Sequence, residues 1–354
     1  MESHRKEKVP RSHLSNLEAR RPVWDVLNAL TQFEEPSLSM DRQAFLEMLN
    51  KDLADEHASI IRYLVHAYQV GEDTPLGQML LSTAREEMWH MNWLGDEIGE
   101  MGEEPLMEKG PFPYDDTSNA SLLRSYIEWE DNLIEEYEAQ AAMVEDRELK
   151  RILQQLGWES LTHRRRFQYW LDKLGPTGEE PLEFEEGGFS AKMMKRFHNE
   201  VDAQYKLVLQ HLRHAFVFEE PICPVGSELE LSAMRHMKHL SHFAEELAEY
   251  GEPLPFDYPG VDTSRDVEVA LSADLDMTQE AQDRFIVLSQ DPEIDQHQDF
   301  KIEVDTMVTR NGLLATVLEE LMEEADAHSE ASDSEDASVG NPDSDAFTVG
   351  SLKD

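Results

Sequence analysis

The chain of 354 residues carries 31 Lys and Arg against 75 Asp and Glu, which gives a formal net charge of −44 at pH 7. So many carboxylates repel phosphate groups, and this excludes a nucleic-acid partner and an anionic membrane surface. The length suffices for two domains that each bury a core. We interpret the charge as a salt-adapted composition, because concentrated salt screens the self-repulsion. The alternative is an ordinary acidic protein.

Cys223 is the single cysteine, which excludes an intrachain disulfide, a cysteine-based zinc site and a four-thiolate iron–sulfur centre. The first residues lack the apolar region of a signal peptide, and no stretch approaches about 18 apolar residues. We therefore expect a cytoplasmic protein without a transmembrane helix.

The chain divides into an arm, a helical body and a tail. Residues 1–40 show no sustained hydrophobic period and are interpreted as an N-terminal arm. In the body, apolar residues recur at three- and four-residue steps between Gly- and Pro-rich segments. This pattern predicts eight helices at 42–70, 76–101, 120–144, 147–173, 190–216, 228–250, 270–289 and 296–322. Residues 326–354 are rich in Ser, Asp and Glu and are predicted to form a disordered acidic tail.

An internal repeat organises the eight helices. The segment 84–118 is similar to 233–264 at an offset of 149 residues. The first helix matches the fifth at an offset of 148, so Gln204 is the equivalent of Glu56 in the repeat. The fourth and eighth helices open with similar residues at an offset of 145. The sequence therefore predicts an all-α fold of two tandem antiparallel four-helix bundles, residues 41–182 and 188–325.

Polar residues interrupt the apolar stripes of the first unit. Glu56 lies on the stripe of the first helix and Glu130 on that of the third, and a tyrosine, Tyr63 or Tyr137, follows each glutamate by seven residues. Such tyrosines serve as hydrogen-bond donors beside a metal or simply as core aromatics.

The second and fourth helices carry matching polar pairs on their stripes. Glu87 and His90 stand three residues apart on the second helix, and Ser160 and His163 take the same spacing on the fourth. Buried carboxylates beside histidines are costly without a compensating cation. We therefore expect metal ions where these four helices meet. The alternative is that these residues lie on solvated faces, and that the neighbouring Glu86, Glu135 and Glu136 face inward as the ligands.

The residues Glu56, Glu87-Met-Trp-His90 and Glu130 resemble the ferritin-like di-iron carboxylate superfamily, of the rubrerythrin and bacterioferritin type. The fourth helix departs from the family pattern, because Ser160-Leu-Thr-His163 replaces the second Glu-x-x-His. The carboxylate nearest to this position is Glu159. The resemblance thus implies a metal site of Glu56, Glu87, His90, Glu130, Glu159 and His163. The acidic composition is similar to that of haloarchaeal proteins.

The second unit lacks this pattern and is expected to keep the fold with a degenerate site. Gln204 replaces Glu56, His236-Met-Lys-His239 replaces Glu87-x-x-His90, Val308 matches His163 by the 145 offset, and only Asp274 or Asp276 is near the position of Glu130. A second interpretation is a zinc, nickel or copper site among the histidines of two adjacent helices, which are His211, His214, His236, His239 and His242.

The resemblance implies oxidoreductase chemistry with O2 or peroxide at two iron ions, or at manganese in their place. An external electron donor is expected, because one cysteine leaves no rubredoxin-like domain. Whether the chain is an enzyme stays open: the alternatives are iron storage or detoxification in a ferritin-type protein and a non-catalytic scaffold or interaction protein. The oligomeric state also stays open, with a homodimer as one option.

Overall fold

The computed structural model describes residues 42–184, 188–218, 225–254 and 256–338, and side chains as far as residue 325. Every regular element in these ranges is a helix. Two short 3-10 helices, η1 (Gly175–Glu179) and η2 (Ile294–Gln296), accompany eight long α-helices. These are α2 (Arg42–Val70), α3 (Pro75–Glu100), α4 (Asn119–Met143), α5 (Arg147–Leu174), α6 (Ala191–Val217), α7 (Val225–Glu249), α8 (Val267–Ser289) and α9 (Gln298–Ser338).

Short polar residues begin the helices where the sequence predicts them. Thr74 accepts a hydrogen bond from Gly77 N at 3.0 Å, and Pro75 occupies the first position of α3. The side chain of Asp146 caps α5 by accepting from the backbone N of Leu149 at 2.9 Å. The all-helical prediction is confirmed for the described residues, and the predicted helix ranges agree closely with the observed ones up to the start of α9.

The end of α9 differs from the prediction. The helix continues to Ser338, so residues 326–338, which were expected to begin a disordered tail, are helical. Neither Gly nor Pro interrupts this stretch before Gly340, although it holds more Ser and Asp than Ala and Glu. The rest of the predicted tail, 339–354, and the predicted arm, 1–40, lie outside the described residues.

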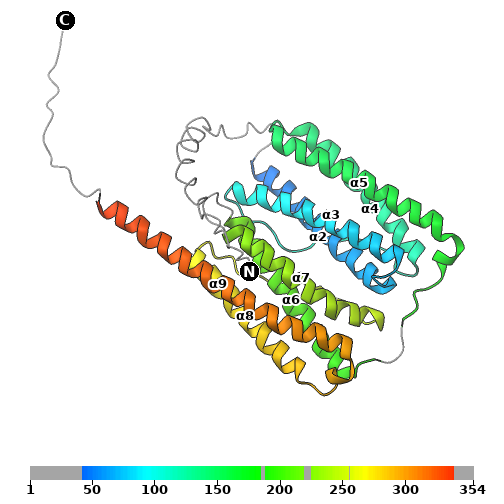
Figure 1. Ribbon diagram of the computed structural model, residues 1–354. Helices are drawn as coiled ribbons and strands as arrows, with labels where there is room; N and C mark the ends of the chain where they lie inside the picture. The colour runs from blue at the N-terminus through cyan, green and yellow to red at the C-terminus, as the bar shows by residue number, and fades with distance from the viewer. Residues whose placement is uncertain (1–41, 185–187, 219–224, 255, 339–354) are drawn as a thin grey trace, which may run out of the picture.

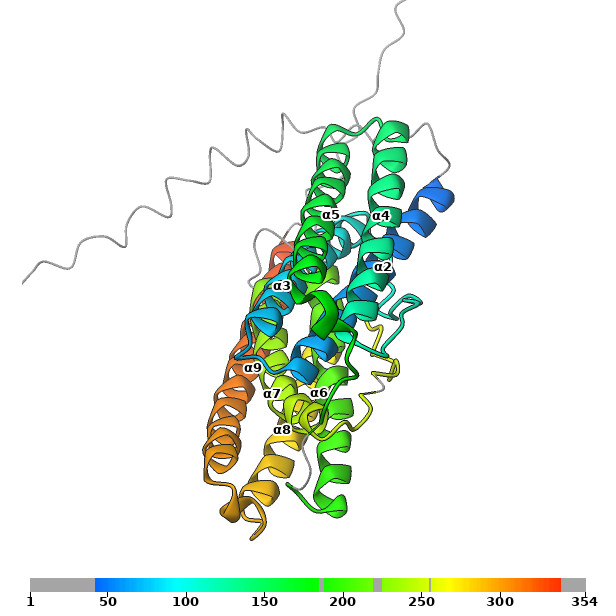
Figure 2. The same cartoon turned by 90° about the vertical axis from the view of Figure 1, so that its right-hand side faces the viewer.

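The eight helices form four antiparallel hairpins that lie side by side (Figures 1 and 2). The α2/α3 hairpin packs against α4/α5 on one side and against α6/α7 on the other, and α8/α9 covers the far side of α6/α7. The first half, α2–α5, thus meets the second half, α6–α9, through its α2/α3 hairpin. One cluster of buried apolar side chains runs through both halves.

Close backbone contact and an ion pair between a buried arginine and a partly exposed glutamate join the two halves. Gly99 of α3 lies against α6 so closely that a Cβ there would be 1.9 Å from the carbonyl oxygen of Phe216. The fully buried Arg213 of α6 donates from Nε and Nη2 to the two carboxylate oxygens of Glu104, both at 2.7 Å. The halves therefore pack with little room for relative sliding at this contact.

None of the described helices is both long and apolar enough to cross a membrane.

Candidate metal centre

Five of the six residues predicted to bind metal meet inside the first half. Glu56 comes from α2, Glu87 and His90 from α3, Glu130 from α4 and His163 from α5, and each is at most 1% exposed. Their ligand atoms form two groups, and within each group the atoms lie within 4.8 Å of one another. The groups share Glu87.

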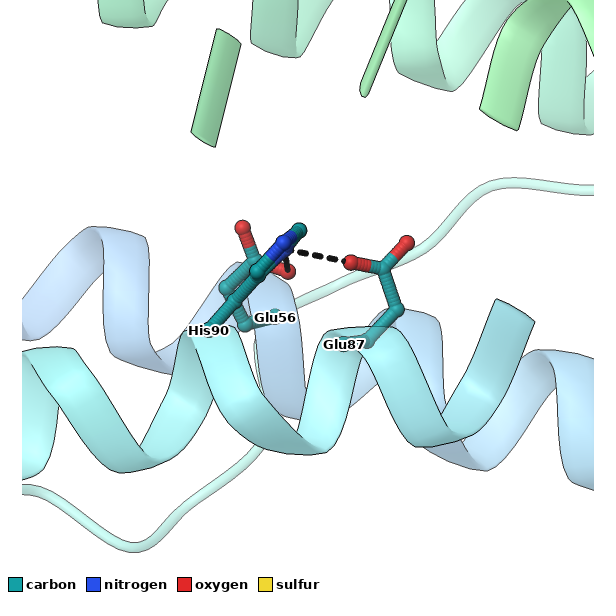
Figure 3. Close-up of side chains that lie close together, drawn as sticks. All are labelled: Glu56, Glu87 and His90. Carbon is teal, nitrogen blue, oxygen red and sulfur yellow. Dashed lines mark hydrogen bonds and ion pairs between the residues drawn. The ribbon is translucent and has the colours of Figure 1, made fainter. Parts of the chain in front are cut away.

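The first group consists of Glu56, Glu87 and His90 (Figure 3). Nδ1 of His90 lies 2.7 Å from Oε2 of Glu87 and 3.4 Å from Oε2 of Glu56. The glutamate and the histidine of α3 stand one helical turn apart, so both side chains point to the same side of the helix. Glu56 approaches from α2.

The second group consists of Glu87, Glu130 and His163. Nδ1 of His163 lies 2.9 Å from Oε1 of Glu87 and 3.6 Å from Oε1 of Glu130. The two oxygens of Glu87 therefore face different histidines, whose rings stack with centroids 5.8 Å apart. A carboxylate placed in this way is suited to bridge two cations.

Several of the atoms in these groups lack a hydrogen-bond partner of suitable geometry. The buried atoms without such a partner are both carboxylate oxygens of Glu87, Oε2 of Glu130 and Nδ1 of His163. Unpaired buried polar atoms are costly, and a bound cation satisfies them. The donor set of three carboxylates and two imidazoles suits iron or manganese, so the residues present fit a pair of such ions.

Two tyrosines bond in a crossed arrangement to Glu56 and Glu130, the outer carboxylates, each of which belongs to only one of the two groups. Tyr63 of α2 donates to Oε1 of Glu130 on α4 at 2.7 Å. Tyr137 of α4 donates in turn to Oε1 of Glu56 on α2. All four side chains are fully buried. Each tyrosine therefore fixes the glutamate of the opposite helix. In Glu56 the oxygen that does not bond to tyrosine, Oε2, faces His90.

Glu159, the sixth predicted ligand, does not join either group. Its Oε2 lies 2.7 Å from Nε2 of His90, the ring nitrogen that does not face Glu87. Glu86 has the same relation to His163, with Oε2 3.0 Å from Nε2. Glu86 and Glu159 each precede a histidine by four residues, and this shared spacing is the sequence signal for their common role.

The charges of the centre perturb its titration. Burial alone would raise the pKa of Glu87, but the adjacent His163 and His90 outweigh this effect and lower it. Burial and the nearby charge of Glu87 raise the pKa of Glu56 to about 8. The carboxylates, led by Glu56 and Glu87, hold the pKa of His90 well above its usual value, although burial opposes this. Without a cation the cluster thus retains protons, which metal ions would displace.

Ser160 occupies the place on α5 that Glu87 has on α3. It lies three residues before His163, is 1% exposed, and its hydroxyl oxygen has no hydrogen-bond partner. Its side chain is much shorter than a glutamate and carries no charge, so α5 supplies no inward carboxylate at this position.

A pocket of about 460 Å³ opens on the surface beside the centre. Glu86 and Glu159 line it together with Arg166, whose Nη1 donates to both oxygens of Glu86 at 2.7 and 2.8 Å. Its remaining lining residues are Trp89, Trp93, Trp158 and Thr162. Since Glu86 and Glu159 contact the histidines, the pocket lies one side chain away from the metal-binding groups.

The second half has a buried polar cluster of different composition. Gln204, His236 and His239 occupy the expected positions on α6 and α7, and all are 0% exposed. The prediction of Asp274 or Asp276 at the position of Glu130 is wrong: the burial pattern of α8 follows that of α4 at an offset of 148, which places Thr278 there. Asp274 instead matches Tyr126.

The predicted match of Val308 with His163 is also wrong. Val308 is only partly buried, whereas Asn311 of α9 is fully buried and donates to the carbonyl oxygen of Thr278 at 3.2 Å. The 145 offset aligned Asp146 with Asp291, but residues after Asp291 form a turn and η2, and α9 begins only at Gln298. Among the described residues, no group of three possible ligands within 4.8 Å lies in the second half.

Comparison of the chain with protein-family models, curated proteins and solved structures finds no match. The described residues form paired antiparallel helices with buried Glu and His groups that could hold metal, and this arrangement is compatible with a ferritin-like fold. The donor set and its geometry therefore carry the functional argument.

Proposed function

We propose that the first half is a ferritin-like dinuclear metal centre that binds two iron or manganese ions and acts as an oxidoreductase on O2 or peroxide. The observation that carries this proposal is Glu87, whose two carboxylate oxygens face His90 and His163 at 2.7 and 2.9 Å. A single residue thus belongs to both metal-binding groups.

The charges of the ligands support two divalent ions. Glu56, Glu87 and Glu130 supply three negative charges, and two divalent ions supply four positive charges, which leaves one positive charge inside the bundle. Glu86 and Glu159, each in contact with a histidine of the centre, offset this remainder from outside. Oxygen-rich ligation with one imidazole for each ion suits redox-active iron or manganese better than a structural zinc.

When bound in the reduced state, the two ions would supply the two electrons that convert H2O2 and two protons into two molecules of water. The residues of the chain prepare the centre for this chemistry. Tyr63 and Tyr137 hold the outer carboxylates, and Glu86 and Glu159 hold Nε2 of the histidines so that Nδ1 faces inward. Ser160 supplies no carboxylate where the family pattern has a fourth glutamate, and we place the small oxygen compound at this position.

The pocket beside the centre supports exchange with solvent. Protons have a short path through it, because two of its lining residues, Glu86 and Glu159, contact the histidines directly. An external donor must return the electrons after each turnover, since one cysteine excludes a four-thiolate redox centre in this chain.

Single-turnover oxidation tests this function. Metal-free protein in molar KCl is loaded without oxygen with two equivalents of Fe2+ and mixed with H2O2 or with O2, and the remaining Fe2+ is measured with time. We expect oxidation at least about tenfold faster than in Glu87→Gln at the same iron concentration. The variant Glu128→Gln, an exposed carboxylate on α4, is the matched control.

Equal rates in the wild type and in Glu87→Gln would overturn the proposal. Uptake of many more than two ions per chain in a large hollow particle would identify iron storage instead, which particle size and iron content distinguish directly. An absence of iron binding in a folded chain would favour the non-catalytic scaffold.

A further inference from the structure

Three histidines gather in the second half at a place equivalent to the metal centre. His236 and His239 of α7 match Glu87 and His90, and His211 of α6 matches Tyr63 at the offset of the repeat. All three are 0% exposed. The ring centroids of His211 and His236 are 5.2 Å apart, and those of His236 and His239 are 5.7 Å apart.

Five of the six ring nitrogens in this cluster have no hydrogen-bond partner. The exception is Nδ1 of His236, which lies 2.8 Å from Oε1 of Gln204. A neutral imidazole has one donor and one acceptor nitrogen, and burying these atoms without partners is unfavourable. The first half shows the same feature, since its metal-binding groups also contain buried atoms without partners.

The surroundings keep these rings in the form that binds metal. Burial and the neighbouring histidines lower the pKa of His236, and burial lowers the pKa of His239 to about 3. Both rings are therefore neutral at ordinary pH, with a lone pair available to a cation. The nearest buried carboxylate is Asp274, whose Oδ1 lies 3.8 Å from Nε2 of His211.

We propose that His211, His236 and His239 form a second, nitrogen-rich metal site for zinc or another late transition-metal ion such as copper or nickel. The donor set separates it from the first site, because imidazole without carboxylate favours these ions over manganese. Each ring has a nitrogen to offer: Nε2 of His236, either nitrogen of His239, and Nδ1 of His211, whose Nε2 points toward Asp274. Metal-bound histidines commonly direct their second nitrogen to such a carboxylate.

Metal binding at this site requires side-chain rotation. The rings contact one another in pairs, so all three must turn toward a common point, while the packed hairpin of α6 and α7 holds their backbones. The inference does not rest on the proposed oxidoreductase function, since it involves none of the residues of the first centre.

Zinc binding in a chain with a disabled first centre tests the proposal. The variant Glu87→Ala/His90→Ala serves as the background, and its zinc content is measured after equilibrium dialysis in molar KCl. We expect one Zn2+ per chain, with an affinity at least about tenfold weaker after addition of His236→Gln or of His239→Gln. His242→Gln is the matched control, because this histidine lies on α7 but is partly exposed and contacts Glu303.

Binding of Co2+ gives a second readout, since strong visible absorption distinguishes a four-coordinate protein site from the six-coordinate aqueous ion. We expect the cobalt absorption in the background variant and in His242→Gln, and its loss in His236→Gln and His239→Gln. Far-UV circular dichroism identifies variants that fail to fold, and either folded glutamine variant suffices for the test. The proposal is overturned if the background chain binds no zinc, or if zinc is retained equally in the folded His236→Gln and His239→Gln variants.

Discussion

Oε2 of Glu159 lies 2.7 Å from Nε2 of His90, while Nδ1 of the same ring lies 2.7 Å from Glu87. The histidine is therefore held between a carboxylate of the centre and a carboxylate at the pocket. Glu86 and His163 repeat this relation on the other side of the centre. These contacts place Glu159 outside both candidate metal-binding groups, in a position to orient His90 under the proposed function.

Replacing Glu86 or Glu159, the two carboxylates that line the pocket, should weaken metal binding without abolishing it. We expect Glu159→Gln and Glu86→Gln to lower iron affinity by about 10- to 100-fold, because each loses the charged partner of a ligating histidine. Competition with a chelator of known affinity measures the change, with Glu128→Gln as the control. If Glu159→Gln removed iron as completely as Glu87→Gln does, Glu159 would be a ligand after all.

Restoring a carboxylate at Ser160 should change reactivity more than binding. In Ser160→Glu, a fourth negative charge stands beside the two ions, so we expect iron to bind more tightly. The same side chain would occupy the position proposed for the oxygen compound, so oxidation of Fe2+ by peroxide should slow by about tenfold. Ser160→Ala adds no atoms at this position and should react like the wild type. An oxidation rate in Ser160→Glu equal to that of the wild type would show that the position is not used.

A carboxyl pair between the α2–α3 connection and α7 should make stability depend on pH. Burial and a hydrogen bond with Glu72 raise the pKa of Glu245 from 4.5 to about 9. The folded state therefore binds the proton of the Glu245 carboxyl more tightly than the unfolded chain does. This proton stabilises the folded state fully below pH 4.5, and the stabilisation is lost as pH rises toward 9.

We therefore expect Glu245→Gln to gain stability relative to the wild type as pH increases through this window. Urea unfolding in molar KCl between about pH 5 and pH 9 measures the difference. A constant difference across this range would rule out the titration of Glu245 as its cause, and Glu128→Gln controls for the loss of one surface charge.

The close contact between the halves should tolerate no side chain at Gly99 of α3. In Gly99→Ala the new Cβ would meet backbone atoms of Phe216, so one helix must move, and we expect a loss of about 1–3 kcal/mol in the free energy of unfolding. Gly312→Ala on α9 is the control, because its nearest neighbour is the flexible end of Gln282. Equal urea midpoints for the two variants would contradict the packing of α3 against α6.

The sequence predicts the helices well because Gly and Pro separate them and apolar residues repeat with a helical period. It fails at the end of α9, where the shortage of apolar residues in 326–338 predicted disorder but no Gly or Pro ends the helix. Low hydrophobicity was a poor guide there because a helix that projects beyond its neighbours needs no apolar face (Figure 1).

The candidate metal centre could be predicted where polar residues interrupt an apolar stripe, as at Glu56, Glu87 and Glu130. The role of Glu86 was missed because it stands one residue off the stripe, and its contact with His163 depends on how α3 and α5 pack. The crossed bonds from Tyr63 and Tyr137 likewise require the spatial pairing of α2 with α4. Periodicity identifies which side chains face inward, and only packing identifies which of them meet.

Metal content per chain tests the central claim most directly. Wild-type protein purified in molar KCl and reconstituted with Fe2+ should hold about two ions per chain. Glu87→Gln should lose both, because Glu87 belongs to both groups, and Glu56→Gln should lose mainly one, because Glu56 belongs to one group. Glu128→Gln should retain both. Two ions retained in folded Glu87→Gln would contradict a dinuclear centre built around this residue.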